Sequence, residues 1–198
     1  MVSSVMVLDF SSAIFASPDT PASSAVLTNL TENKLPDHFI LCFSVKQNKI
    51  DGKIPFALYG EDNNPWLAFS FWKGSSGVSL WADVQTGNFT KLHSIEKPWT
   101  HVWMHLCAEV DTVTGDMAVS LNGGTPIIGR DENLLTNKPS YLKDNIKIGL
   151  SKENYFALGS DQFFGFVSNI NIFTSNKSQS LESMTSNPCD QGDFMAWS

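Results

Sequence analysis

Residues 101–123, "HVWMHLCAEVDTVTGDMAVSLNG", decide the fold class because apolar and polar residues alternate in their first half. The even positions before residue 111 are apolar: Val102, Met104, Leu106, Ala108 and Val110. The odd positions hold His101, Trp103, His105, Cys107 and Glu109. A period of two is that of a β-strand with one face toward the core. Because "TVTGD" supplies turn residues before the next apolar run, the segment predicts a β-hairpin whose even residues face the core.

The histidines, cysteine and carboxylates of this segment also suggest a metal or catalytic cluster. In an extended strand His101 and His105 stand roughly 13 Å apart, at about 3.3 Å per residue, which is too far to share one ion. Only close same-face pairs such as His105 and Cys107 approach chelating reach. We therefore favour a polar, solvent-facing side of a strand, with any binding chemistry elsewhere.

Strand patterns rich in aromatic and β-branched residues recur along the chain. They cover residues 39–45, 65–71, 77–84, 100–110, 116–121, 145–150 and 163–173. Segments with Gly, Pro, Asn or Asp separate them, which is typical of an all-β sandwich or barrel. The sequence predicts at most one short helix, near residues 175–187. A chain of 198 residues fits a single domain spanning residues 1–198.

The three cysteines allow at most one internal disulfide. In the 39–45 segment alternate residues from Phe39 to Val45 are apolar, which places Cys42 on the opposite face. Cys107 also lies on the less apolar face of its strand. Neighbouring strands are about 5 Å apart, so two cysteines on one face of adjacent strands can bond. We predict a Cys42–Cys107 disulfide, which leaves Cys189 over.

Composition excludes several classes of function. The net charge is -7 and the basic residues are scattered, which argues against nucleic acid as a partner. No apolar run approaches the roughly 18 residues of a membrane span, so we expect no membrane insertion. The first residues lack the basic region of a signal peptide, so we expect the chain to begin inside a mature domain.

No common enzyme motif is present: the sequence has no G-x-S-x-G, H-E-x-x-H, P-loop or G-x-G-x-x-G. The close acidic pairs, Glu61 with Asp62 and Asp131 with Glu132, are adjacent residues whose side chains point apart on a strand. A glycosidase needs two carboxylates facing each other across a cleft. We therefore predict a protein that is not an enzyme, with a sandwich glycosidase as a distant alternative.

Three loops at strand ends are rich in oxygen ligands, at residues 60–65, 151–154 and 160–162. Carboxylate and amide oxygens are the ligands that calcium prefers, although Asn and Asp also serve ordinary turns. Aromatic residues near these loops, Trp66, Trp72 and Tyr155, are candidates for stacking on a sugar ring. Glycosylation sequons occur at Asn29, Asn88 and Asn176 and permit a secreted glycoprotein.

The order of these motifs resembles the pentraxins and the wider laminin-G-like, concanavalin A-like jelly rolls. The matching pieces are Cys42 in "FILCFSV", the H-x-C strand with its hairpin, "IKIG" (146–149) and "FFGFVSNINIF" (163–173). They cover roughly residues 5 to 198. The resemblance implies a jelly-roll sandwich in which the two cysteines are joined. The last residues, "GDFMAWS", resemble the start of a final strand, which suggests a fragment of a longer protein with that strand truncated.

The resemblance further implies calcium-dependent recognition of sugars or phosphorylated head groups. The lysine in "LSKEN" intrudes among the expected ligands, so we expect at most one Ca²⁺. The expected metal ligands are Asp62, Asn63, Glu153 and Asp161. The expected ligand-binding residues are Trp66, Tyr155, Asn154 and Gln162. The leading hypothesis is a secreted or extracellular lectin-like domain that binds carbohydrate at this loop edge.

The alternative is a laminin-G-like adhesion or assembly module. Its partner would be a cell-surface or matrix protein, and the degraded calcium loops favour it. Cys189 supports it as well, because an odd cysteine in an oxidising compartment suggests a bond outside this segment. The resemblance to ring-forming pentraxins also allows a homo-oligomer.

Overall fold

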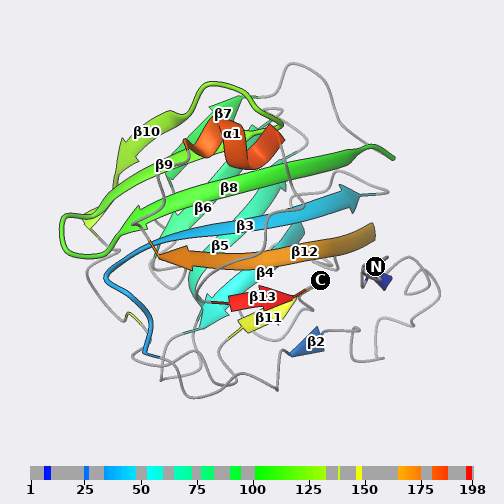
Figure 1. Cartoon of the computed structure of the whole chain (residues 1–198), viewed down its shortest axis with the longest axis horizontal. Helices are drawn as coiled ribbons and strands as arrows, with labels where there is room; N and C mark the ends of the chain where they lie inside the picture. Colours follow the sequence, from blue (N-terminus) through cyan, green and yellow to red (C-terminus); the bar gives the residue numbers. More distant parts are fainter. Residues whose placement is uncertain are drawn as a thin grey trace.

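The chain folds as a sandwich of two antiparallel β-sheets, shown in the computed structural model of Figure 1. The structure describes residues 7–9, 25–26, 34–47, 53–59, 65–72, 77–82, 90–94, 101–132, 138, 146–148, 165–174, 180–186 and 195–197. No helix in these ranges has the length and apolar character needed to span a bilayer. The predicted all-β sandwich is confirmed.

The front sheet has the strand order β1-β12-β3-β8-β9-β10. Its strands are β1 (Val7–Asp9), β12 (Gly165–Thr174), β3 (His38–Gln47), β8 (Trp103–Asp111), β9 (Asp116–Leu121) and β10 (Ile127–Arg130). A short strand, β13 (Met195–Trp197), pairs with β12 on the edge that β1 also uses. β1 lies opposite Phe166–Ser168 and β13 opposite Ile170–Ile172, so two distant parts of the chain share one strand edge.

The back sheet has the order β2-β11-β4-β5-β6-β7 and lies behind the front sheet in Figure 1. Its strands are β2 (Ala25–Val26), β11 (Ile146–Ile148), β4 (Lys53–Tyr59), β5 (Pro65–Trp72), β6 (Gly77–Ala82) and β7 (Thr90–Ser94). We call the side of the front sheet toward the back sheet its inner face and the other side its outer face. The non-consecutive neighbours, such as β12 beside β3, make this a jelly roll rather than a simple meander.

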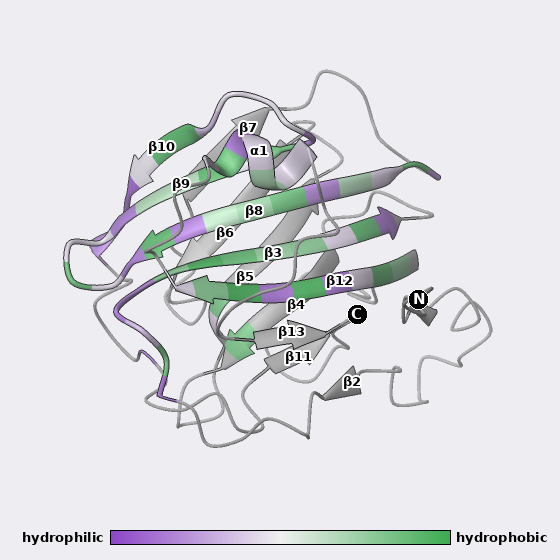
Figure 2. Cartoon of the chain, in the orientation of Figure 1, coloured by the Kyte–Doolittle hydropathy of each residue, from purple (hydrophilic) through white to green (hydrophobic). Residues whose placement is uncertain are grey.

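The inner face of the front sheet carries the core, as the alternation in β8 predicts. Met104, Leu106, Ala108 and Val110 are fully buried, and so are the apolar residues of β3 beside them. Figure 2 shows the alternation of hydrophobic and hydrophilic residues along these strands. Val102 is the exception, with 57% of its surface exposed. It precedes the first residue of β8, next to His101 in a left-handed conformation, so the strand period does not extend to it.

The outer face is partly covered by the short helix α1 (Leu181–Ser186), which lies inside the predicted 175–187 segment. Its Leu181 and Met184 pack in one cluster with Ile40, Cys107 and Phe173. The prediction of a solvent-facing polar side for β8 is therefore wrong at Cys107, which is buried beneath the helix. Burial here comes from a segment distant in the sequence, which strand periodicity cannot reveal.

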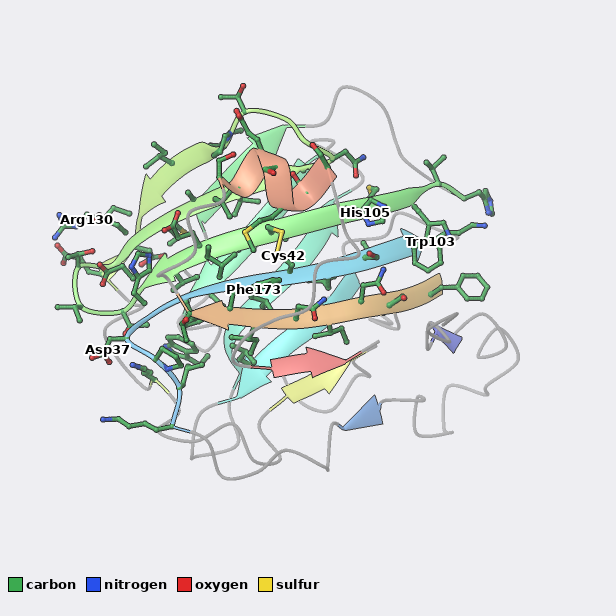
Figure 3. All side chains as sticks on the ribbon, viewed as in Figure 1. Asp37, Cys42, Trp103, His105, Arg130 and Phe173 are labelled. Carbon is green, nitrogen blue, oxygen red and sulfur yellow. A yellow bond between two sulfur atoms is a disulfide. The ribbon has the colours of Figure 1, made fainter. Side chains whose placement is uncertain are left out.

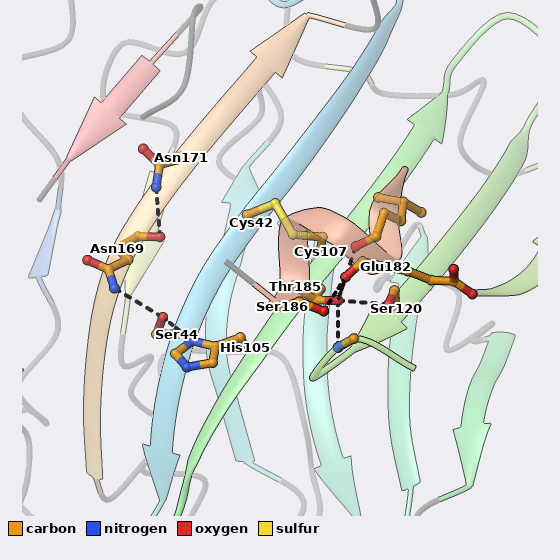
Figure 4. The surroundings of a disulfide bond; sticks show 12 residues. Cys42, Ser44, His105, Cys107, Ser120, Asn169, Asn171, Glu182, Thr185 and Ser186 are labelled. Atoms are coloured by element: carbon orange, nitrogen blue, oxygen red, sulfur yellow. Dashed lines mark hydrogen bonds between the residues drawn. A yellow bond between two sulfur atoms is a disulfide. The ribbon is translucent and has the colours of Figure 1, made fainter. Parts of the chain in front are cut away.

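Thr185 fixes α1 to the turn after β9. Its Oγ1 accepts the backbone N–H of Gly123 at 2.8 Å and lies 3.0 Å from Ser120 Oγ (Figure 4). The same hydroxyl donates to the carbonyl of Leu181 at 3.0 Å. Gly123 has a φ of 74°, and a Cβ at this position would collide with the Ser186 hydroxyl. The backbone conformation therefore favours glycine, and any larger residue would also require the Ser186 hydroxyl to move.

Candidate binding surface

Most of the site residues predicted from sequence lie outside the described residues. These are Asp62, Asn63, Glu153, Asn154, Tyr155, Asp161 and Gln162, together with the sequons at Asn29, Asn88 and Asn176 and with Cys189. The calcium site, the loop-edge ligand site and the glycosylation sites therefore stay predictions. Among the described residues, no group of three or more His, Cys, Asp or Glu side chains is placed to hold a metal ion.

Trp66 is a core residue rather than the stacking platform predicted from sequence. Only 1% of its surface is exposed, and its ring lies 6.5 Å from that of Phe39, centroid to centroid. Its indole Nε1 is buried and has no hydrogen-bond partner among the residues that the structure describes. A ring enclosed between two sheets presents no face to a sugar, so the proximity of Trp66 to a polar loop in sequence was misleading.

The predicted disulfide is confirmed. Cys42 and Cys107 are directly opposite each other on β3 and β8, and their sulfur atoms are bonded at 2.06 Å. The bond therefore joins two neighbouring strands in the middle of the outer face, under α1 (Figures 3 and 4). A cysteine in a disulfide cannot bind a metal, which removes Cys107 from the cluster suggested by its segment.

A row of polar residues lies next to the disulfide on the outer face, two positions away along β3 and β8. It consists of His105, Ser44 and Ser168, which are directly opposite one another on β8, β3 and β12. We call these three the polar row. The Ser44 hydroxyl is 2.7 Å from His105 Nδ1 and accepts a hydrogen bond from Asn169 Nδ2 at 3.3 Å (Figure 4). Ser168 is 3% exposed, and within the described part of the chain its hydroxyl has no hydrogen-bond partner. The polar row therefore contains a buried polar atom whose hydrogen-bonding capacity is unused.

A β-bulge in β12 places the amide that completes this network. The register with β3 shifts between Ser168 and Asn171, and Asn169 between them has a φ of 51°. Asn tolerates this left-handed conformation better than most residues. Asn171 follows on the outer face and donates its Nδ2 to the Asn169 carbonyl at 3.1 Å. The bulge thus turns the Asn169 side chain toward Ser44.

His105 is half-buried, and this burial lowers the pKa of its imidazole. The neutral ring is therefore favoured near neutral pH. A Ser–His contact also occurs in hydrolases, where a third group orients the histidine and the serine is accessible to substrate. Here Ser44 is buried, and no carboxylate among the described side chains bonds to His105. The contact is thus a hydrogen bond that satisfies buried groups.

The next row toward the end of the sheet consists of Trp103, Lys46 and Phe166, again directly opposite one another on β8, β3 and β12. We call it the aromatic row. The two rings are 6.4 Å apart, and Lys46 Nζ lies 5.9 Å from the centroid of the Phe166 ring. All three side chains are partly exposed. Sequence reasoning placed Trp103 on this face but missed its two neighbours, because their positions depend on the register of three strands.

Comparisons with known proteins find similarity in structure alone. No protein-family model matches the chain, and no curated protein matches it in sequence. The heptameric SAP-like pentraxin of Limulus polyphemus is 16% identical, with a TM-score of 0.59 over 88% of this chain and 87% of that one. Domain 4 of AbnA, an extracellular arabinanase of Geobacillus stearothermophilus solved with arabinotriose, is 17% identical, with a TM-score of 0.52 over 95% and 82%.

A third solved structure is a much longer protein. The extracellular region of zebrafish Gpr126 is 16% identical, with a TM-score of 0.59 over 81% of this chain. The chain spans only 21% of that region. The shared feature in all three comparisons is the two-sheet sandwich. The chain therefore has a jelly-roll fold like that of the Limulus pentraxin.

Proposed function

We propose that this chain is a non-catalytic recognition domain that binds carbohydrate or a related polar ligand. The observation that carries the proposal is the aromatic row lying beside the polar row on the outer face of the front sheet. Aromatic faces pack against the apolar face of a sugar ring, while nearby polar groups bond its hydroxyls. The polar groups of this face that are not buried are those of His105 and Asn169, and they lie beside two partly exposed rings.

The rigidity of this surface supports a binding role. The Cys42–Cys107 bond fixes the spacing of β3 and β8 next to the polar row. A preorganised surface binds more tightly because less conformational freedom is lost on association. A disulfide also fits an oxidising compartment, so a secreted or extracellular location is part of the proposal. The solved arabinanase domain, in complex with arabinotriose, supports the idea that this fold can present a sugar-binding surface.

The loop-edge site remains a second part of the proposal. Asp62, Asn63, Glu153 and Asp161 would hold one Ca²⁺, with Tyr155, Asn154 and Gln162 contacting the ligand. The choice of ligands rests on the preference of calcium for oxygen. A melting curve in calcium against one in chelator tests it. If the Ca²⁺ concentration is well above the dissociation constant of the site, the ion should raise the melting temperature by several degrees. Identical curves would remove calcium from the proposal.

A glycan array with the folded protein tests the whole proposal. Far-ultraviolet circular dichroism and a cooperative melt should first show that the sample is folded. We expect binding to a restricted set of saccharides and competition by the free sugar. Trp103→Ala should weaken that binding, whereas Ile128→Ala, at a distant exposed position on β10, should not. A flat array, repeated with calcium present, would contradict the proposal.

A protein-binding module is the second candidate, favoured by the edge strand β10. Among the described strands this one pairs with β9 alone, and its Ile128 is 80% exposed. Exposed edges pair with strands of other chains, and an apolar residue there adds affinity. A second copy of the chain would be the simplest partner. Sedimentation of the wild type and of Ile128→Lys tests this, because the lysine should abolish self-association. A wild type that stays monomeric at every concentration would contradict self-pairing.

A further inference from the structure

We propose that the aromatic row is a subsite for a carboxylated sugar, in which Lys46 binds the carboxylate. The inference deepens the proposed carbohydrate-binding function and rests on it. It concerns the outer face of the front sheet and is independent of the loop-edge residues. Trp103, Lys46 and Phe166 are the residues that define it.

The register places Lys46 on the strand between the two that carry the rings. Lys46 lies on the middle strand, β3, and its direct neighbours on either side are Trp103 and Phe166. Its Nζ is 5.9 Å from the Phe166 ring centroid, which is within the range of a cation–π contact. The ring therefore helps to hold the ammonium group over the face of the sheet. The charge of the ammonium group stays available to a ligand, because the quadrupole of the phenyl ring attracts a cation without neutralising it.

Lys46 has no carboxylate partner among the side chains that the structure describes. Other basic residues do have one: Lys138 pairs with Asp37, and Arg130 lies 4.0 Å from Asp116. An ammonium group without a counter-ion favours an anionic ligand, because the two can form a charge-assisted hydrogen bond.

The rest of the chain limits how many charges the ligand carries. The protein has a net charge of -7, and Lys46 is the single cation of the aromatic row. Polyanions such as nucleic acids and highly sulfated chains bind to clusters of basic residues, and an acidic protein repels them. A single cation in an acidic protein therefore favours a ligand that carries a single carboxylate.

The polar row identifies the rest of the ligand as a sugar. It lies about 7 Å from the aromatic row, two residues along each strand. Half-buried His105 and Asn169 lie there at the level of Ser44, with which both form contacts. A pyranose with its carboxylate at Lys46 and its apolar face on a ring can direct hydroxyl groups toward this row.

The experiment compares two oligosaccharides that differ in one group, a glucuronate-terminated probe and its glucose-terminated counterpart, by isothermal titration calorimetry. We expect the wild type to bind the glucuronate probe about tenfold more tightly, as a charge-assisted hydrogen bond predicts. Lys46→Met, which keeps the aliphatic stem, should remove this preference, and Lys46→Arg should keep it. Arg130→Met is the matched control, because it removes one positive charge at the opposite end of the sheet (Figure 3).

Two further measurements complete the test. Phe166→Leu should weaken binding of both probes, and of the glucuronate probe more, because it removes both a ring and the cation–π contact that holds the Lys46 ammonium group. A glucose-terminated probe that carries a sulfate ester in place of the carboxylate distinguishes the anions, and we expect it to bind less tightly than the glucuronate probe. Circular dichroism of each variant confirms its folding before titration.

The outcomes separate the inference from the proposed function. Equal binding of the two probes by the wild type would overturn the inference, and so would a preference that survives in Lys46→Met or tighter binding of the sulfated probe. In each of these cases binding of sugars would still support the proposed function. Absence of binding to every saccharide of the array and to both probes would overturn both.

Discussion

Removal of the Cys42–Cys107 disulfide should destabilise the domain by about 4 kcal/mol. The bond closes a loop across a sequence separation of 65 residues. In the chain-entropy description, a cross-link over a loop of this length restricts the unfolded chain by about 4 kcal/mol at 25 °C. For a chain of this size, each kcal/mol corresponds to about 2–4 °C, so the melting temperature should fall by about 8–16 °C.

The test compares three samples by urea denaturation, all in a Cys189→Ala background that prevents exchange with the third thiol. The samples are the oxidised protein, the same protein kept reduced, and the Cys42→Ala/Cys107→Ala variant. Reduction removes only the cross-link and should cost the full entropic amount. The variant also loses sulfur atoms that pack beneath Leu181 and Met184, so it should be less stable than the reduced protein by about 1 kcal/mol more.

The result that would refute this reasoning is a reduced protein within about 1 kcal/mol of the oxidised one. It would mean that the unfolded chain already keeps these two strands together, so that the bond restricts little. The opposite order, with the alanine variant more stable than the reduced protein, would show that the packing of the sulfur atoms under α1 contributes nothing favourable.

Three further changes test the local interactions. Thr185→Val should cost about 1–3 kcal/mol in urea denaturation, because it leaves the Gly123 N–H unpaired, whereas Thr185→Ser should cost less. Backbone N–H groups of Val113 and Thr114 hold the pKa of Asp111 below its usual range. The ionised Asp111 carboxylate therefore stabilises the folded state above its ordinary pKa, and this stabilisation is lost as the pH falls through the lowered pKa. In Asp111→Asn, the free energy of unfolding should depend less on pH in this acidic range. Burial lowers the pKa of His105, so the unfolded chain takes up its proton first. Stability should therefore fall as the pH drops below about 6.5, and less in His105→Gln; equal slopes would contradict this.

The alternation of residues was sufficient to predict the central strands and the disulfide. The pattern in β8 separates a core face from an outer face, and the predicted strand at residues 116–121 coincides with β9. Strands with less regular patterns were missed. β4 begins at Lys53, inside a segment interpreted as a turn because of its Gly and Pro, and β10 is an edge strand of four residues. Pairing with neighbours outweighs weak local preference at such positions.

The aromatic row could not be predicted because periodicity assigns a face and not a neighbour. Lys46 and Phe166 are 120 positions apart in the sequence and meet only through the register of β3 with β12. A shift of one residue would move either of them to the inner face. The bulge at Asn169 makes the alternation of β12 change phase within the strand, so even its face assignment needs the structure.

The arrangement of rows on the outer face connects stability with binding. Helix α1 covers the part of this face that contains Cys107 and Phe173, whereas the aromatic row lies toward the other end and is partly exposed. The polar row lies between the disulfide and the aromatic row, on the same three strands. A cross-link at this place fixes the spacing of β3 and β8 for both rows at once. Loss of the disulfide should therefore weaken sugar binding even at temperatures where the variant remains fully folded, because the strands that carry Lys46 and Trp103 gain freedom that binding must then remove.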